Sequence, residues 1–423
     1  MKQTEFKELI RAGGLSCYSE LYSDTAAEAD RFIEAVNSYA RSFGGGDISV
    51  FSVPGRSEII GNHTDHNGGK VMAGAITRDI IAVAAPNGDG VIRYRSEGYA
   101  EDTVRLCDVT STKRFKKFTS RALVAGMAGG FIKEGYKVGG FNVYMTTKVL
   151  RGSGLSSSAA FEVMIGNILN HLYNGGKVDN KEIAKLAQYS ENVYFGKPCG
   201  LMDQMACAVG SFVYIDFADR DNPEVEPVNF SLADSGYALC IVNTGGSHAS
   251  LNGDYASVPT EMKAVAAICG RELLVGLTEE DVLARAERIR KEAGDRALLR
   301  AIHFIRECKR VDVARLALKR GDIESFLDAV RSSGNSSFRY LQNVYTNKAP
   351  REQGISLALA MSEEYLEERG GAWRVHGGGF AGTVQAFVRR EDLSGYVSLM
   401  NSVFGEGAVD VLGIRPLGAV KLF

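Results

Sequence analysis

The stretch that most constrains the fold is a strand, a loop of small residues and a helix in direct succession. Apolar residues alternate through Phe141–Val149, as expected of a strand, and the loop RGSGLSSSA follows at 151–159. Apolar residues then recur at helical spacing over 160–172, which predicts a helix ending at Asn174-Gly175-Gly176. Such a junction directs free N–H groups and the positive end of the helix dipole at one point, which suits phosphate oxygens. An ordinary Gly/Ser turn that caps a helix has the same local pattern. Other segments of the chain are therefore needed to distinguish a phosphate-binding loop from such a turn.

A second informative stretch follows the predicted strand Ile48–Val53. Pro54–Gly69 reads PGRSEIIGNHTDHNGG and concentrates polar side chains among glycines: Arg56, Glu58, Asn62, His63, Asp65, His66 and Asn67. A polar surface loop between strands accounts for part of this pattern. The same mixture of donors and acceptors also suits a sugar, because each sugar hydroxyl both donates and accepts a hydrogen bond.

A third stretch, FGKPCGLMDQ at 195–204, places Asp203 among small and apolar residues ahead of the predicted strand Ser211–Phe217. A lone aspartate here is consistent with a helix cap, a buried hydrogen-bonded group or a catalytic carboxylate. Glu191 lies near the end of the predicted helix Lys181–Val193, from which its side chain can reach the space around Asp203.

A late glycine-rich segment, AWRVHGGGFAGTVQAFV, occupies Ala372–Val388. Its glycines at 377–382 formally match G-x-G-x-x-G, but a dinucleotide-binding fingerprint requires a helix after the glycines. Val384, Ala386 and Val388 alternate instead, which predicts a strand. We therefore expect a hairpin-like glycine loop whose backbone approaches a ligand or another loop closely.

The remaining pattern mixes strands and helices. Helices are predicted over Ala26–Phe43, Ser120–Lys133 and much of Glu261–Leu327, and strands over short apolar runs between Val71 and Tyr94 and over Tyr237–Asn243. Thr244–Pro259 is predicted to be a second polar loop, carrying His248, Asp254 and Tyr255, and the polar segment Asp219–Glu226 marks a break near residue 220.

Composition narrows the class of protein. A chain of 423 residues with 45% hydrophobic residues has room for two domains, and a net charge of −2 with a pI near 6.4 argues against a nucleic-acid partner. No apolar run reaches the ~18 residues of a membrane span, and the first residues resemble no signal peptide, so we expect a cytoplasmic protein without a membrane partner. The seven cysteines and six histidines show no metal-binding spacing. The sequence does not indicate an oligomeric state.

The chain lacks the motifs of two kinase classes, the Walker A kinases and the protein kinases. The chain has no G-x-x-x-x-G-K-[ST] loop and no HRD or DFG sequence. The order and spacing of its glycine-rich stretches at 54–69, 152–159 and 377–382 instead resemble the three motifs of the GHMP kinase superfamily. Together these motifs extend over nearly the whole chain.

Within that superfamily the sequence is most similar to galactokinases. Their signature is close to G-R-V-N-L-I-G-E-H-T-D-Y-N-G-G, and Gly55–Gly69 reads G-R-S-E-I-I-G-N-H-T-D-H-N-G-G. The family sequence C-G-I-M-D-Q resembles Cys199–Gln204, and the H-S-L…E-Y segment resembles His248–Tyr255.

This resemblance implies an enzyme that uses ATP and Mg²⁺ to phosphorylate the anomeric hydroxyl of α-D-galactose. It assigns Asp203 and Arg56 to catalysis and implies a sugar site of Asn62, His63, Asp65, Gly200 and Tyr255. ATP would bind Gly152, Gly154, Leu155, Ser156, Ser157, Ser158 and Ala159. Ser158 and Glu191 would hold the metal, and Gly377, Gly378 and Gly379 would form the third glycine loop.

Departures from the family pattern leave the sugar open. Asn62 stands where galactokinases usually have Glu, at a position that the resemblance associates with the far hydroxyls of the sugar, and His66 replaces the usual Tyr. A kinase for a related pyranose or amino sugar, or a non-catalytic sensor of galactose and ATP, are the alternatives. Retention of Ser156–Ala160 and Asp203 favours an enzyme.

The resemblance also implies a fold class. We expect an α+β protein with the two-domain GHMP kinase fold, in which mixed sheets and helices form an N-terminal domain over 1–220 and a C-terminal domain over 221–423. The first domain would carry the sugar motif and the phosphate loop, and the second the third glycine loop. The active site would lie in the cleft between them.

Overall fold

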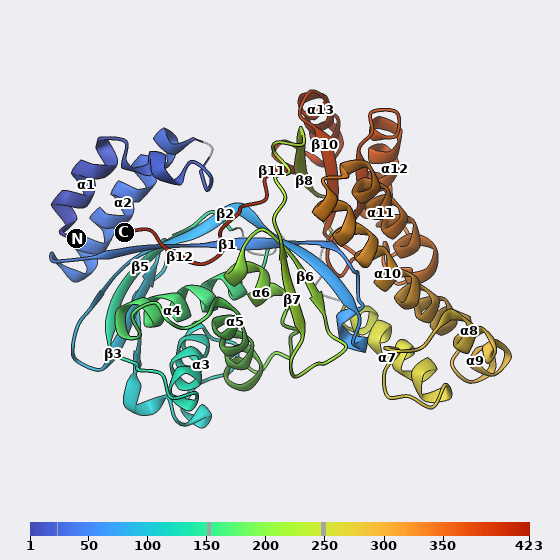
Figure 1. Ribbon diagram of the computed structural model, residues 1–423, viewed down its shortest axis with the longest axis horizontal. Helices are drawn as coiled ribbons and strands as arrows, with labels where there is room; N and C mark the ends of the chain where they lie inside the picture. The colour runs from blue at the N-terminus through green and yellow to red at the C-terminus, as the bar shows by residue number, and fades with distance from the viewer. Residues whose placement is uncertain (23, 150–153, 247–250) are drawn as a thin grey trace.

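The computed structural model describes residues 1–22, 24–149, 154–246 and 251–423. Two sheets and the helices around them form an elongated molecule (Figure 1). The larger sheet has eight strands among the described residues, in the order β12-β1-β2-β5-β3-β4, with β6 paired to β2 and β7 to β6. Their bounds are β1 Ser49–Ile60, β2 Lys70–Pro86, β3 Val91–Ser96, β4 Asp102–Arg105, β5 Phe141–Thr147, β6 Phe212–Asp216, β7 Glu224–Val228 and β12 Val420–Lys421. The β3–β5 pair is parallel and the other pairs are antiparallel, so the expected mixed sheet is present.

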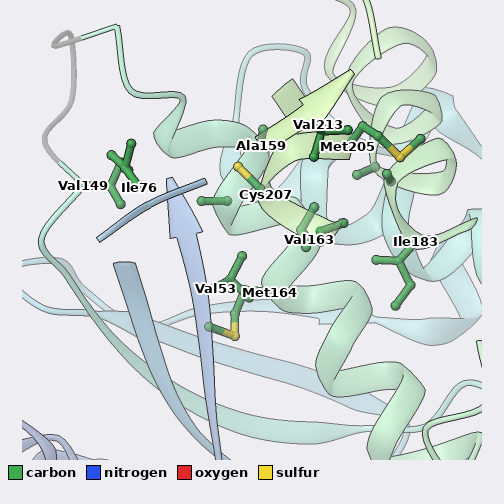
Figure 2. Close-up of a cluster of buried hydrophobic side chains, with 14 of the residues drawn as sticks. Val53, Ile76, Val149, Ala159, Val163, Met164, Ile183, Met205, Cys207 and Val213 are labelled. Atoms are coloured by element: carbon green, nitrogen blue, oxygen red, sulfur yellow. The ribbon is translucent and has the colours of Figure 1, made fainter. Parts of the chain in front are cut away.

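Helices cover both faces of this sheet. One face packs against α3 Ser120–Lys133, α4 Ser157–Tyr173, α5 Asn180–Tyr189 and α6 Met202–Val209, and the other against α1 Gln3–Arg11 and α2 Thr25–Phe43 (Figure 1). Strand alternation produces the two cores: Ile81 and Val83 of β2 face α2, whereas Ala82 and Ala84 face the core of α4. Figure 2 shows how that second core buries one side of α4 through Ala159, Val163 and Met164.

The smaller sheet is antiparallel and has four strands among the described residues, in the order β11-β8-β10-β9. The bounds are β8 Tyr237–Asn243, β9 Ala372–Val375, β10 Thr383–Arg389 and β11 Val409–Leu412. Seven helices complete this half: α7 Asn252–Ile268, α8 Glu279–Leu283, α9 Ala286–Glu292, α10 Asp295–Arg320, α11 Ile323–Ser336, α12 Gly354–Leu366 and α13 Leu393–Phe404. The β9–β10 hairpin is the one predicted around the late glycines.

The two halves share a core, and the later part of the chain contributes two strands to the larger sheet. Phe326 of α11 packs against both Phe212 of β6 and Phe387 of β10, with ring centroids 6.0 and 5.2 Å apart. Strands β7 and β12 belong to the larger sheet although both lie beyond residue 220, and β12 pairs with β1. Residue 220 therefore does not separate the two sheets.

Three segments differ from their predicted form. The stretch from Pro54 continues β1 as far as Ile60, with register shifts at Pro54/Arg56 and Glu58/Ile60, because bulges accommodate proline and glycine within a strand. The first two of the apolar runs predicted between Val71 and Tyr94 form one strand, β2, and the last run forms β3. In the predicted loop Thr244–Pro259, α7 begins at Asn252 and contains Pro259, so Asp254 and Tyr255 lie on a helix; His248 lies outside the described residues. No described helix has the length and apolarity to span a bilayer.

Candidate active site

Arg56 and Asp203 form a two-point ion pair. Arg56 projects from β1 and Asp203 from the first turn of α6, and Arg56 Nε and Nη2 lie 2.7 Å from Asp203 Oδ1 and Oδ2. Burial alone would raise the pKa of Asp203, but the guanidinium and a hydrogen bond from Ser156 outweigh it and hold that pKa below its usual value. Asp203 is therefore an ionised acceptor whose side chain remains 33% exposed.

The loop before α4 is attached to this pair. Gly154 has a positive φ of 75°, and its carbonyl accepts a hydrogen bond from Arg56 Nη1. Ser156 is also left-handed, with φ 55° and ψ 57°, and its hydroxyl donates to Asp203 rather than capping the helix. Within the described residues no side chain caps the first amides of α4, so these amides are available to an anion.

The other residues of the loop before α4 contribute to the site mainly through their backbone groups. Leu155 and Ala159 are buried in the core beneath α4, while Ser157 and Ser158 occupy the helix's first turn. A side chain at Gly55 would meet the Leu155 carbonyl at 2.8 Å, so glycine is needed for β1 to approach the loop this closely. Gly152 lies outside the described residues.

The expected metal ligands have suitable chemistry. Glu191 lies in a π-helical turn, Ser190–Phe195, and its carboxylate is bonded by Lys197 Nζ at 3.2 Å and Gln204 Nε2 at 2.9 Å. Glu162 is on α4, one turn after Ser158, and its two buried carboxylate oxygens have no hydrogen-bond partner among the described residues. Burial, followed by the charge of Glu191, raises the pKa of Glu162 well above its usual value.

These oxygen donors fit Mg²⁺, which is usually held by one or two protein groups together with phosphates and water. Across the described residues, no three His, Cys, Asp or Glu side chains converge as a metal cluster.

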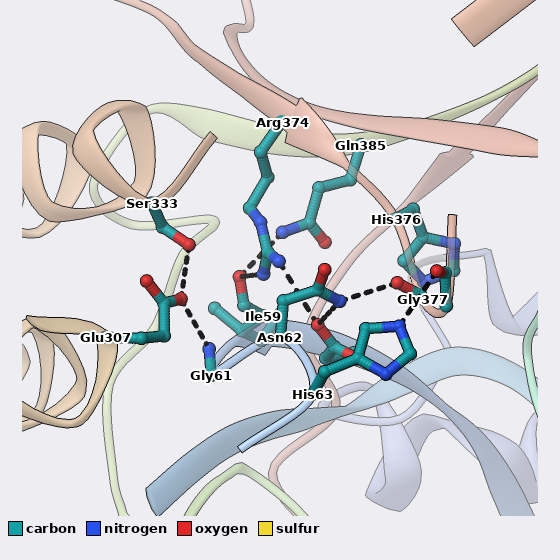
Figure 3. A network of polar contacts seen from close by, with 12 residues as sticks. Ile59, Gly61, Asn62, His63, Glu307, Ser333, Arg374, His376, Gly377 and Gln385 are labelled. Carbon is teal, nitrogen blue, oxygen red and sulfur yellow. Dashed lines mark hydrogen bonds and ion pairs between the residues drawn. The ribbon is translucent and has the colours of Figure 1, made fainter. Parts of the chain in front are cut away.

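The third glycine loop lies against the predicted sugar residues. Three successive carbonyls accept hydrogen bonds. Gly377 accepts from Asn62 Nδ2 at 2.6 Å and Gly378 from His63 Nε2 at 2.9 Å (Figure 3). Gly379 accepts from Tyr255 Oη at 2.9 Å. Gly379 has φ 77°, and a side chain there would come within 2.0 Å of the Asn343 carbonyl. This position therefore requires glycine.

Gly200 and Asp65 lie next to each other in the predicted sugar site. A side chain at Gly200 would lie 2.9 Å from Asp65 Oδ2, so glycine leaves that carboxylate accessible. The third loop also borders the phosphate loop, since a side chain at Gly154 would meet His376 Cε1 at 3.1 Å. The structure thus brings parts of all three sequence motifs together, while the Asn62 side chain is fully buried behind the glycine turn.

Several residues at the site were not singled out from the sequence. Asn343 Nδ2 donates to Asn62 Oδ1 at 2.6 Å and to the Gly378 carbonyl at 3.1 Å. His376 bonds Ser57 Oγ and Thr383 Oγ1, and burial lowers its pKa to about 3, so it is neutral. The Trp-Arg-Val-His run before the glycines was a signal for His376, whereas no local pattern marks Asn343.

Family models match two segments of the chain. Residues 122–211 match the GHMP kinases N terminal domain, and residues 37–86 match the galactokinase galactose-binding signature.

Curated relatives align over most of the chain. A galactokinase of Streptomyces coelicolor is 30% identical over 369 residues, which cover 86% of this chain and 90% of that protein. A galactokinase of Bacillus subtilis is 26% identical, covering 85% and 90% of the two chains.

Solved structures share the fold. The Lactococcus lactis galactokinase complexed with galactose superposes with a TM-score of 0.76 at 24% identity, covering 91% of this chain and 98% of the other. The Methanococcus jannaschii mevalonate kinase superposes with a TM-score of 0.60 at 14% identity, covering 87% and 99%.

Proposed function

Because this chain belongs to the galactokinase family of the GHMP kinases, we propose that it transfers the γ-phosphoryl group of ATP to the anomeric hydroxyl of D-galactose. Phosphoryl transfer to a sugar hydroxyl is the activity of its family; galactose, the anomeric position, Mg²⁺ and the residue roles are the proposal. The observation that carries it is the contact between Asp203, Arg56 and the loop at the start of α4.

Asp203 would orient the sugar hydroxyl and accept its proton. Its depressed pKa keeps it ionised, and Arg56 holds both carboxylate oxygens in place. The same guanidinium bonds the Gly154 carbonyl, so the acceptor and the phosphate loop keep a fixed relative position. As the hydroxyl oxygen attacks the γ-phosphorus, the bond to the ADP oxygen breaks and ADP leaves.

The phosphates would lie over the first turn of α4. The amides of Ser157, Ser158 and Ala159, with the positive end of the helix dipole, would stabilise the charge on the moving phosphoryl group. Ser158 and Glu191 would hold Mg²⁺, which when bound neutralises charge on the phosphate oxygens. Asp65, Gly200, His63 and Tyr255 would contact the sugar.

A coupled ADP-release assay tests the proposal with a panel of free sugars that includes D-galactose, N-acetylgalactosamine, D-glucose and L-arabinose. We expect the highest kcat/KM for galactose, and a phosphorus NMR spectrum of the product should show a 1-phosphate. Turnover of another sugar alone would overturn the choice of galactose. Sugar binding without ADP release from any sugar would support the sensor instead.

A further inference from the structure

The orientation of the Asn62 amide is determined by its neighbours. Its Nδ2 atom lies 2.8 Å from Glu58 Oε1 and 2.6 Å from the Gly377 carbonyl oxygen. A carboxylate and a carbonyl can only accept, so the NH₂ group must face them, and Oδ1 then accepts from Asn343 Nδ2. Both amide protons are thereby used within the protein (Figure 3).

Glu58 is the buried charge of this network. It projects from β1 with 7% of its surface exposed, and Arg374 Nη2 on β9 lies 3.2 Å from the same Oε1 atom. Arg374 Nη1 also donates to the Ile59 carbonyl at 2.8 Å. Loss of that pairing would leave a buried charge without compensation.

A carboxyl group at position 62 fits this network less well than the amide does. Ionised, it would place a second negative charge beside Glu58; protonated, it would supply one proton for the two acceptors, Glu58 Oε1 and the Gly377 carbonyl. The geometry therefore favours one carboxylate and one amide at these two positions. The galactokinase signature given above carries Asn at the position of Glu58 and Glu at that of Asn62, so the two groups have exchanged places.

We propose that Glu58 and Asn62 act as one specificity unit, which keeps the Glu58 carboxylate on β1 against Arg374. The part of the sugar site that borders the glycine turn, here called the wall, then presents only neutral groups: the Asn62 amide and the carbonyls of Gly377 and Gly378. This inference rests on the proposed function. It implies that the sugar hydroxyl at this wall finds no carboxylate acceptor. An analogue without that hydroxyl should then be accepted nearly as well as galactose, because no buried polar group loses its partner.

The test is a double-mutant cycle of Glu58→Asn, Asn62→Glu and the combined exchange. The control is Glu226→Asn, which removes a carboxylate from an ion pair with Arg315 on another surface. For each variant we measure the melting temperature and kcat/KM for galactose and its four monodeoxy analogues. Each single change should lower the melting temperature and reduce kcat/KM at least tenfold, and the exchange should recover to within about threefold of wild type.

The exchanged variant should also discriminate against at least one deoxy analogue tenfold more strongly than wild type does. Effects of the single changes that simply add in the double variant would overturn the pairing, and an unchanged deoxy profile would overturn the specificity role. If wild type phosphorylates no sugar, the proposed function fails separately, and recovery of the melting temperature in the double variant still decides the pairing.

Discussion

Replacing Asp203 by Asn removes the charge of the proposed acceptor while keeping its shape. Arg56 donates to both carboxylate oxygens at 2.7 Å, so an amide NH₂ at either position loses one of these bonds. Ser156 also donates to Oδ2, but its hydroxyl can rotate and accept instead. The substitution therefore costs about one charge-assisted hydrogen bond, ~1.5–3 kcal/mol, which a domain of ordinary stability survives.

The catalytic loss should be larger than this structural cost. Loss of a positioned acid–base group typically reduces kcat about 10²–10⁴-fold, equivalent to ~3–5 kcal/mol of barrier. ATP affinity should change less than about threefold, because Asp203 would contact the sugar rather than the nucleotide. Steady-state kinetics and calorimetric ATP titration measure the two quantities on the same sample.

Asp312→Asn is the matched control. Asp312 is ion-paired to Lys70 at 2.7 Å and its side chain is 33% exposed, as that of Asp203 is. It should show a comparable loss of stability with kcat unchanged. A kcat for Asp203→Asn within tenfold of wild type, or an equal loss in the control, would refute the assignment.

Three further changes test other parts of the structure. Gly200→Ala pushes a methyl group against Asp65 Oδ2 and should raise the sugar KM about tenfold with ATP binding unchanged; an equal rise in the ATP KM in initial-rate kinetics would contradict this. Burial opposes ionisation of Glu307 on α10, but Arg310 and other nearby groups, among them Arg374 and Ser333, together outweigh burial and lower its pKa to about 2. This carboxylate therefore contributes ~3 kcal/mol to stability, which is fully present above about pH 4.5 and lost towards pH 2. Urea unfolding of Glu307→Gln should show a free energy of unfolding lower than that of wild type by this amount at pH 7. The difference should shrink as the pH falls below 4.5, and a difference that does not change with pH would contradict the assignment. Glu191→Gln should weaken Mn²⁺ binding to the ATP-loaded protein at least tenfold by electron paramagnetic resonance, and unchanged binding would remove Glu191 from the metal site.

Local patterns predicted the elements that carry the site. The helical stripe over 160–172 corresponds to α4, and the alternation after the late glycines corresponds to β10, because both patterns reflect one buried face. The continuation of β1 through Pro54 was missed, since proline and glycine are local strand breakers and the compensating register shifts depend on β2.

Local sequence patterns could not predict the long-range contacts of the site. Asn62 was identified by comparison with a motif, but its bonds to Gly377 and Asn343 join residues 315 and 281 positions apart. No periodicity encodes such a pair. The roles of Glu58 and Asn343 emerged only when the fold brought these segments together.

The separation of Asn62 and Gly377 along the sequence also determines when their contact can form during synthesis. At about 5–20 residues per second, synthesis of the 315 intervening residues takes roughly 16–63 s. For nearly all of that interval the residues of β1 have been synthesised, whereas Arg374, the counterion of Glu58, has not. On the ribosome, the wall of the sugar site can therefore form only late in synthesis, and burial of Glu58 before then would leave its charge uncompensated.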